Sequence, residues 1–243
     1  MSCWTLIPPP GTHPIMNSEN KAVPHGHFLD TPELPRGITR FWLIRHAVVE
    51  ASARKTMYGA LDVPLCRDAM AEQQGGYAAL ARRLPQDARW FSSPLQRAKD
   101  TASEIRRAGN FQDNISTDGR FVEQSIGDWH GTPHEQFSAC LKLPPHPFWS
   151  LCASELPPGG ESMLDVCARV SHALEELATA NEGHDMVVVS HGGAIRAALA
   201  HALGVHPDTA LRFTIQNLSI SIIERINGMW RVVAVNELPD FKG

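Results

Sequence analysis

Two apolar segments that each end at a histidine set the strongest limit on what this chain can fold into. Residues 39–45 and 185–190 are short, rich in β-prone side chains and free of Gly and Pro, as is typical of strands buried in the middle of a parallel sheet. His46 and His191 follow them directly. A parallel sheet requires long connections between its strands, usually helices, and the rest of the chain must supply them.

Helices are predicted where apolar side chains recur every three to four residues behind a capping residue. They run from Asp68 to Leu84, from Ser93 for about four turns, from Ser162 past Leu177, and from Gly192 to near Gly204. In the second of these helices, Ser93 is the expected N-cap, with Pro94 at the first helical position and Gln96 completing a capping box.

The remaining pattern defines the fold class and the domain organisation. A short strand is predicted over 89–92, and a hairpin over 218–235, because Asn227-Gly228 is typical of a two-residue turn. Strands that alternate with helices and end in a hairpin predict an α/β fold, a three-layer α/β/α sandwich whose central sheet is mostly parallel with an antiparallel part. Residues 1–36 are rich in Pro and lack apolar periodicity, which predicts a flexible N-terminal extension before a catalytic domain over 37–243.

Charge and composition exclude several classes of function. Lys and Arg number 22 against 26 Asp and Glu, for a formal net charge of −4, so nucleic acid is not an expected partner. No apolar stretch is long enough to cross a bilayer, and the first residues do not resemble a secretion signal. The five cysteines are widely spaced, as expected for reduced thiols in a cytoplasmic protein. The protein is expected to be a monomer or a homodimer. His13, His25 and His27 lie in the extension, where they have no fixed geometry for a metal.

The two histidines that follow the strands stand where an α/β sheet places its ligands. Because parallel strands present their carboxyl ends at one edge, His46 and His191 are expected to project into one crevice. Arg45 precedes His46, Arg97 stands near a helix start, and Gly192 opens another helix with free backbone N–H groups. Such guanidinium and N–H donors favour an anion, and the fork of a guanidinium suits phosphate.

Four segments in this order resemble the histidine phosphatase superfamily, also called phosphoglycerate-mutase-like. Arg45-His46-Ala47 resembles the family's Arg-His-Gly motif, and residues 92–102 resemble its second arginine block. Residues 122–131 resemble the acid-bearing block, and residues 190–193 resemble the second-histidine block. Each string is short, but four of them in order are specific, and the resemblance runs from Thr39 to Val235.

The resemblance implies catalytic roles for His46, Glu123, His191, Arg45 and Arg97. His46 would be the nucleophile that forms a phosphohistidine, with its other ring nitrogen held as N–H against a backbone carbonyl. The two arginines and His191 would hold the phosphate oxygens, and a protonated His191 would add a third positive charge. Glu123 would protonate the leaving alkoxide and then activate water. This scheme needs no metal and no other cofactor.

Three positions depart from the family's pattern. Ala47 replaces the usual Gly and adds one methyl group beside the phosphate. Ser52 stands where the family often carries an Asn that contacts phosphate, and it is carried over with Gly192 as a phosphate-binding residue. His130 stands where an acidic residue is common.

A small phosphorylated molecule is the expected substrate. The segments 57–65, 148–162 and 217–219 are similar to the α-ribazole phosphatase branch of the family. Tyr58, Phe148 and Trp149 are candidates for stacking on a ring in the leaving group.

Several functions remain open at this point. A phosphomonoesterase comes first. A phosphoglycerate-mutase-type isomerase comes second, because the additional Arg, Asn and Tyr residues of mutases are missing around Glu123. A phosphate-binding protein without turnover comes third, kept in view by Ala47. A serine hydrolase built on Ser190 is disfavoured, because Val188 occupies the place of the first glycine in a G-x-S-x-G elbow.

Overall fold

A six-stranded sheet forms the middle layer of the fold in the computed structural model, which describes residues 36–112 and 114–240. Its strands are β1 (Thr39–Arg45), β2 (Arg89–Ser92), β3 (Ile115–Thr117), β4 (Asp185–Ser190), β5 (Ile220–Ile226) and β6 (Met229–Glu237). The order is β3-β2-β4-β1-β5-β6, parallel from β3 to β1 and antiparallel from β1 to β6. The predicted mostly parallel sheet with an antiparallel part is therefore confirmed.

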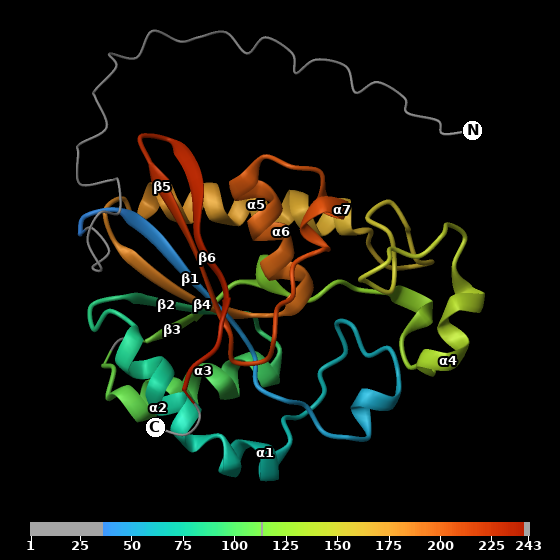
Figure 1. Ribbon diagram of the computed structural model, residues 1–243, viewed down its shortest axis with the longest axis horizontal. Helices are drawn as coiled ribbons and strands as arrows, with labels where there is room; N and C mark the ends of the chain where they lie inside the picture. Colours follow the sequence, from blue (N-terminus) through green and yellow to red (C-terminus); the bar gives the residue numbers. More distant parts are fainter. Residues whose placement is uncertain (1–35, 113, 241–243) are drawn as a thin grey trace, which may run out of the picture. The chain divides into compact units, whose positions relative to one another are not determined.

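Helices cover both faces of the sheet, which confirms the three-layer α/β/α prediction (Figure 1). One face carries α1 (Arg67–Glu72), α2 (Gln74–Arg83) and α3 (Gln96–Gly109). The other face carries α5 (Met163–Ala180), α6 (Gly192–Leu203) and α7 (Pro207–Ala210). The helix α4 (His134–Phe137) lies apart from them. Short 3₁₀ turns cover Ala53–Lys55, Gly119–Phe121, Gly127–Trp129 and Ser138–Cys140.

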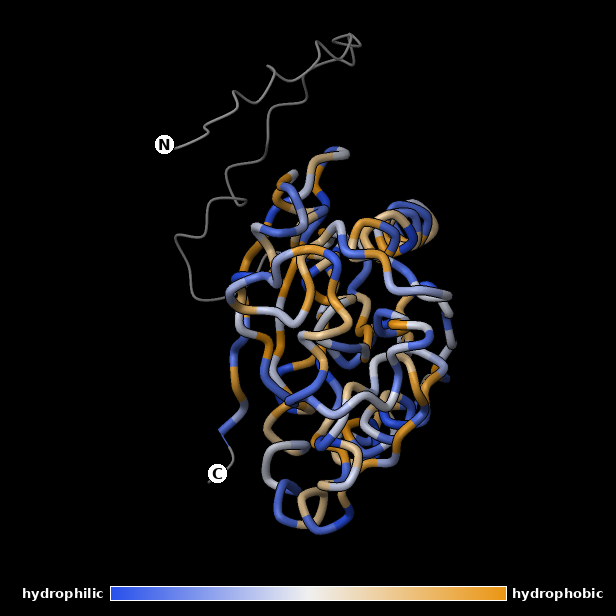
Figure 2. The backbone as a smooth tube through the Cα atoms, turned by 90° about the vertical axis from the view of Figure 1, so that its right-hand side faces the viewer, coloured by the Kyte–Doolittle hydropathy of each residue, from blue (hydrophilic) through white to orange (hydrophobic). Residues whose placement is uncertain are grey.

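The core follows from the two apolar segments that the sequence singles out. In β1 and β4 the side chains of Phe41, Ile44, Val187, Val188 and Val189 are fully buried, because helices cover these central strands on both faces. Figure 2 shows hydrophobic stretches running through the middle of the described fold and hydrophilic ones mainly at its periphery. Burial of these strands fixes where their carboxyl ends lie, and the candidate site is built there.

The helix starts are only partly as predicted. Ser162 caps α5 by a reciprocal capping box with Asp165, as its sequence indicates. The expected capping by Ser93 is wrong: α3 starts at Gln96 with Leu95 as its N-cap, and the Gln96 N–H donates instead to Asp62 Oδ1 at 2.7 Å. The predicted helix over 68–84 is two helices that meet at Gln73.

The C-terminal hairpin and the sheet edge complete the comparison. Asn227 and Gly228 both have positive φ, 50° and 77°, which the predicted two-residue turn requires. The edge strand β3 is an additional element that its three residues do not reveal in the sequence.

Among the described residues, no helix combines the length and apolarity that a membrane span requires. The predicted extension, with its three histidines, lies outside the described residues except for Arg36.

Candidate active site

Three neighbouring parallel strands bring their carboxyl ends together at one edge of the sheet. His46 follows β1, His191 follows β4 and Ser93 follows β2. The His46 N–H donates to the Ser190 carbonyl at 2.9 Å, which ties the ends of β1 and β4. The two imidazole rings lie with centroids 5.1 Å apart. The predicted meeting of the two histidines at one edge of the sheet is confirmed, because parallel register places equivalent strand ends side by side.

The backbone around His46 fixes its tautomer. Its Nδ1 lies 2.7 Å from the Ala47 carbonyl oxygen, and since a carbonyl only accepts, Nδ1 carries the proton and Nε2 keeps a free electron pair. The Asn217 amide donates to the carbonyls of both His46 and Ala47, at 2.7 and 3.1 Å. The Ala47 N–H donates to Thr101 Oγ1 at 2.9 Å. The ring of His46 is therefore held in one orientation with Nε2 available.

Two arginines supply permanent charge beside this ring. Arg97 is fully buried, and its guanidinium donates to the carbonyls of Leu61 and Gly59 at 2.6 and 2.8 Å. Arg45 donates to the Ile215 carbonyl at 2.6 Å. The Nε atoms of both arginines are buried and have no partner in the described part of the chain. Buried donors without partners are rare and costly, so these atoms indicate a site for an anion.

His191 contributes a third buried donor. Its Nε2 lies 2.8 Å from Ser93 Oγ, while its Nδ1 is buried without a partner among the described residues. Ser93 Oγ already accepts from the Leu95 N–H at 3.3 Å. We therefore infer that the hydroxyl donates its own proton to Nε2 and that the ring proton is on Nδ1. Burial first, and then the charges of His46 and the arginines, hold the pKa of His191 well below its usual value. His191 is therefore a neutral donor here, and its protonation beside a bound phosphate stays a prediction.

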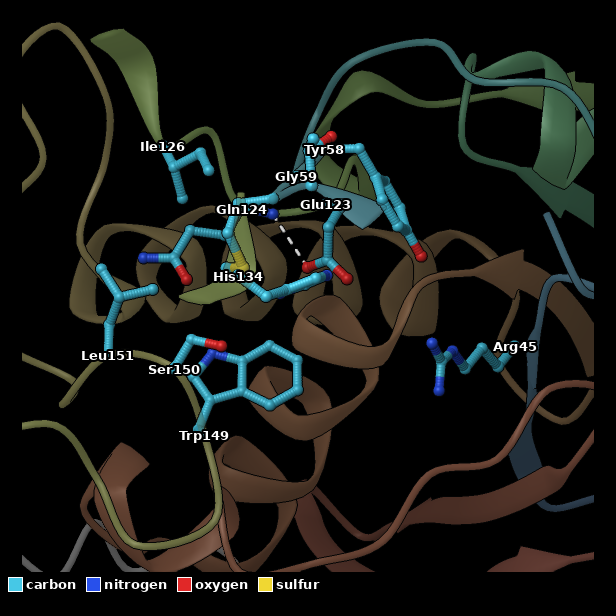
Figure 3. Close-up of a pocket in the computed structure, with 12 residues that line it drawn as sticks. Arg45, Tyr58, Gly59, Glu123, Gln124, Ile126, His134, Trp149, Ser150 and Leu151 are labelled. Atoms are coloured by element: carbon cyan, nitrogen blue, oxygen red, sulfur yellow. Dashed lines mark hydrogen bonds between the residues drawn. The ribbon is translucent and has the colours of Figure 1, made fainter. Parts of the chain in front are cut away.

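Glu123 is positioned by backbone N–H groups at the start of α6. The Gly193 N–H lies 3.1 Å from each of its carboxylate oxygens, and the Gln124 N–H donates to Oε1 at 2.9 Å (Figure 3). A Cβ atom at residue 193 would lie only 2.2 Å from Oε1. The glycine is therefore required for this approach, which the sequence motif does not explain. The positive end of the α6 dipole adds to the attraction.

Gly192 and Ser52, the other two residues expected to bind phosphate, lie in different parts of the structure. A Cβ at Gly192 would lie 3.0 Å from Arg196 Nη1 and 3.7 Å from Arg45 Nε, so this glycine lies beside two guanidinium groups and gives room mainly to that of Arg196. Ser52 is exposed and lines a different surface groove, together with Glu50, Ala51, Cys66, Arg67 and Asp68. The structure does not bring Ser52 to the histidines, because the loop that carries it turns away into a 3₁₀ turn.

A cavity of about 180 Å³ adjoins Glu123 and Arg45. Figure 3 shows Tyr58 and Glu123 on one side of it and Trp149 on the other, with Arg45 at one end. Its lining also includes Thr56, Met57, Gly59, Gln124, Ile126, His134, Ser150 and Leu151. Phe148 does not line this cavity; it is 64% exposed and lines a second one. Of the three expected stacking residues, only Tyr58 and Trp149 share a space beside the site.

Several positioning residues were not predicted from the sequence. Arg169 donates to the Glu123 carbonyl at 3.4 Å and pairs with Glu161 at 2.7 Å. His130 accepts from the Ala60 and Ile126 N–H groups, both at 3.3 Å, and so joins the loop of Tyr58 to the segment after Glu123. Burial lowers the pKa of His130, which keeps the acceptor neutral. Arg196 donates to the Gly192 carbonyl at 3.1 Å. It lies four residues after Gly192 in α6, and this helical spacing indicates that the two residues share one face of the helix.

Neutral His46 and His191 predict how stability depends on pH. Burial and then the nearby arginines hold the pKa of His46 well below its ordinary 6.5, and burial does the same for His191. Below about pH 6.5 the folded protein then binds fewer protons than the unfolded chain. The free energy of unfolding is therefore greatest above about pH 6.5 and falls as the pH decreases from there through the lowered pKa values of the two histidines in the folded protein.

Urea unfolding at a series of pH values checks this expectation. The His191→Gln variant should lose part of the pH dependence, whereas His184→Gln, a change at an exposed histidine, should keep it. A free energy of unfolding that rises as the solution is acidified would contradict neutral, buried histidines.

Comparisons with known proteins agree with this geometry. The family model of the histidine phosphatase superfamily (branch 1) matches residues 41–238. A glucosyl-3-phosphoglycerate phosphatase of Mycolicibacterium vanbaalenii is 33% identical over 182 residues, covering 70% of this chain and 77% of that one. The chain spans about half the length of the first curated relatives that it matches.

Solved structures share the fold. The native mycobacterial glucosyl-3-phosphoglycerate phosphatase aligns with a TM-score of 0.68 at 26% identity, over 82% of this chain and 98% of that chain. The α-ribazole phosphatase of Shigella flexneri aligns with a TM-score of 0.66 at 20% identity, over 82% and 96%. The family model covers most of the chain, and the paired strand ends carry the residues of its motifs. The protein therefore belongs to the histidine phosphatase superfamily, branch 1.

Proposed function

We propose that this protein is a metal-independent phosphomonoesterase that acts through a phosphohistidine on Nε2 of His46. The observation that carries the proposal is one cluster: a histidine whose Nδ1 proton is held by a carbonyl, beside three buried donors that have no partner among the described residues. These donors are Arg45 Nε, Arg97 Nε and His191 Nδ1. A phosphoryl group placed there would satisfy all three while facing the free Nε2.

Charge in the cluster matches a phosphate monoester. Arg45 and Arg97 bring two permanent positive charges, while His46 and His191 are neutral because burial and the arginines lower their pKa. A monoester dianion is balanced by the two guanidinium groups. The neutral His191 acts as a hydrogen-bond donor through Nδ1, and it becomes easier to protonate as negative charge accumulates beside it.

Phosphoryl transfer then takes place in two steps. In the first, Nε2 of His46 forms a bond to phosphorus while the bond to the leaving oxygen breaks, and the Glu123 carboxyl group gives its proton to that oxygen. In the second, the Glu123 carboxylate takes a proton from water, the water oxygen attacks phosphorus and the N–P bond breaks. The products are the alcohol and phosphate, and His46 returns to its starting form. Oε2 shares only the Gly193 N–H, so it is the oxygen suited to carry the proton.

The leaving group of this reaction would occupy the cavity between Tyr58 and Trp149. Aromatic and apolar side chains line it together with the polar Gln124 and Ser150, which suits a small molecule with a ring and hydroxyl groups. Relatives named for glucosyl-3-phosphoglycerate and α-ribazole substrates support a small phosphate ester. They favour hydrolysis over the mutase alternative.

The experiment that tests this function compares leaving groups in EDTA. An aryl phosphate needs little help from an acid, whereas an alkyl phosphate needs a proton on its alkoxide. Glu123→Gln should therefore lower kcat/KM for the alkyl ester by roughly 10²–10⁴-fold and for the aryl ester much less. With the aryl ester, this variant should also release a burst of one phenol per enzyme, since water attack is slowed.

Glu135→Gln is the matched control, because Glu135 is exposed on the short helix α4. It should leave both esters unaffected. Equal losses for the two esters in Glu123→Gln would remove the acid role from Glu123. Turnover that disappears in EDTA would overturn metal-independent hydrolysis, and α-ribazole phosphate as a third substrate tests the similarity to that branch.

A further inference from the structure

A second cavity adjoins the candidate active site through Arg45. Its volume is about 580 Å³, and it opens between the segment after α6 and the loop of Phe148. Its lining comprises Arg45, Val48, Gln73, Phe148, Arg196, Arg212, Phe213, Thr214, Ile215, Gln216, Asn217 and Leu238. Three of these residues are arginines and none is an Asp or Glu. A cavity with this lining attracts anions.

Arg196 forms the inner wall of the second cavity. Its side chain is almost fully buried, and it donates to the Phe213 and Gly192 carbonyls at 2.9 and 3.1 Å. The guanidinium lies over the Trp149 ring, 4.3 Å from its centre, where Trp149 lines one cavity and Arg196 the other. It forms no ion pair and its Nη2 forms no hydrogen bond with a described residue. The buried charge is therefore fixed by two carbonyl oxygens and the Trp149 ring; the Glu123 carboxylate attracts it at a distance but forms no salt bridge with it.

Arg212 stands at the mouth of the same cavity. It is exposed, and its guanidinium lies 5.8 Å from the centre of the Phe148 ring. Within residues 36–112 and 114–240 it has no ion pair. An exposed aromatic ring under a cation orients the guanidinium at low entropic cost. Arg212 and Phe148 thus form a rim that suits a charged or planar group.

A phosphoryl group beside His46 would not neutralise the charges of Arg196 and Arg212. Arg45 and Arg97 balance a phosphate dianion, and Glu123 is held by backbone N–H groups. Because Arg45 lines both cavities, a ligand whose phosphate contacts Arg45 can extend toward Arg196 and Arg212. Its far end would then meet positive charge that the phosphate does not neutralise.

We propose that this second cavity is a subsite for a second anionic group, with Arg196 and Arg212 as its cations. The preferred substrates are then phosphomonoesters whose leaving group lies beside Glu123 and Tyr58 and also reaches past Arg45 into the second cavity with a carboxylate or a further phosphate. The statement about substrates rests on the proposed function, whereas binding of a second anionic group at this subsite does not depend on turnover. Phe148, which does not line the cavity beside Glu123, takes its place at this rim.

Binding of phosphonates, which are not hydrolysed, tests the subsite without turnover. Calorimetry should show that the wild type binds an alkane-α,ω-bisphosphonate of matching length roughly tenfold more tightly than the monophosphonate of the same chain, as one charge-assisted contact provides. Arg212→Gln should remove most of this preference and leave monophosphonate affinity unchanged. Arg82→Gln, which removes a charge from an exposed position on α2, is the matched control and should keep the preference.

Turnover identifies the second anion. Alkyl phosphates that end in a carboxylate, a phosphate or a hydroxyl group are compared, and the higher kcat/KM among the first two names the source of the charge. The advantage over the hydroxyl ester should shrink in Arg212→Gln and at high salt. Equal binding of mono- and bisphosphonates at every chain length, or a preference that survives Arg212→Gln, would overturn the subsite. A binding preference without any turnover would retain the subsite and overturn the proposed function.

Discussion

His46→Ala should abolish phosphate release, with kcat lowered on the order of 10⁴-fold or more, because the variant has no atom to accept the phosphoryl group. No neighbouring side chain replaces it: His191 uses Nε2 to contact Ser93 and points its Nδ1 proton into the site. Phosphate binding should persist, since Arg45, Arg97 and His191 keep their carbonyl and hydroxyl contacts. Steady-state kinetics and calorimetry with inorganic phosphate measure the two effects separately.

A chemical trap makes this expectation specific to a phosphohistidine. Wild-type protein quenched in base during turnover of a radiolabelled ester should retain label that acid removes, as a phosphorus–nitrogen bond requires, and His46→Ala should retain none. His184→Ala is the matched control because His184 is exposed in a loop, and it should label like the wild type. Label on the His46→Ala protein, or release of phosphate at the wild-type rate, would assign the nucleophile elsewhere.

The second large effect is expected at a residue that carries no chemistry. Gly193→Ala should lower kcat roughly 10²-fold or more, the usual contribution of a general acid–base group. The added Cβ would lie 2.2 Å from Glu123 Oε1 and 3.3 Å from Met163 Cε. Since Met163 is buried at the start of α5, the carboxylate is the group that must move, and it loses the Gly193 N–H.

A double-mutant cycle separates this displacement from damage to the fold. In the Glu123→Ala background, Gly193→Ala should add little, because the clash and the acid are both gone. Gly119→Ala is the control: a Cβ there meets no atom within 4 Å, and activity should be unchanged. Thermal melts establish that each variant is folded. A Gly193→Ala protein with full activity would show that Glu123 does not work from the position seen beside α6.

Local sequence patterns predicted most of the secondary structure, for reasons that the fold confirms. Breaker-free apolar runs became β1 and β4 because central strands are covered on both faces. Ser162 and Asn227-Gly228 act within three residues of their partners, so their roles can be seen in the sequence. The strand β3 was missed because three residues paired along one side give almost no periodic signal.

The pairing of His46 with His191 was also predictable, since it depends only on two parallel strands ending at the same edge. What Ser93 does was not. Its place before Pro94 is typical of a helix cap, yet its hydroxyl contacts a histidine 98 residues further along the chain. Ser93 Oγ still accepts from the nearby Leu95 N–H at 3.3 Å, but this bond does not cap α3, and the contact with His191 depends on tertiary packing.

Local patterns thus predict most of the strands and helices, and the position of the strand ends predicts which histidines meet. The lowered pKa of His191, the position of Ser52 in another groove and the second cavity beside Arg196 follow only from the packing of distant segments. Secondary structure follows periodicity and capping, which are local properties of the chain. Burial, charge proximity and the choice of hydrogen-bond partners depend on side chains far apart in sequence, and these exist only after the layers have packed.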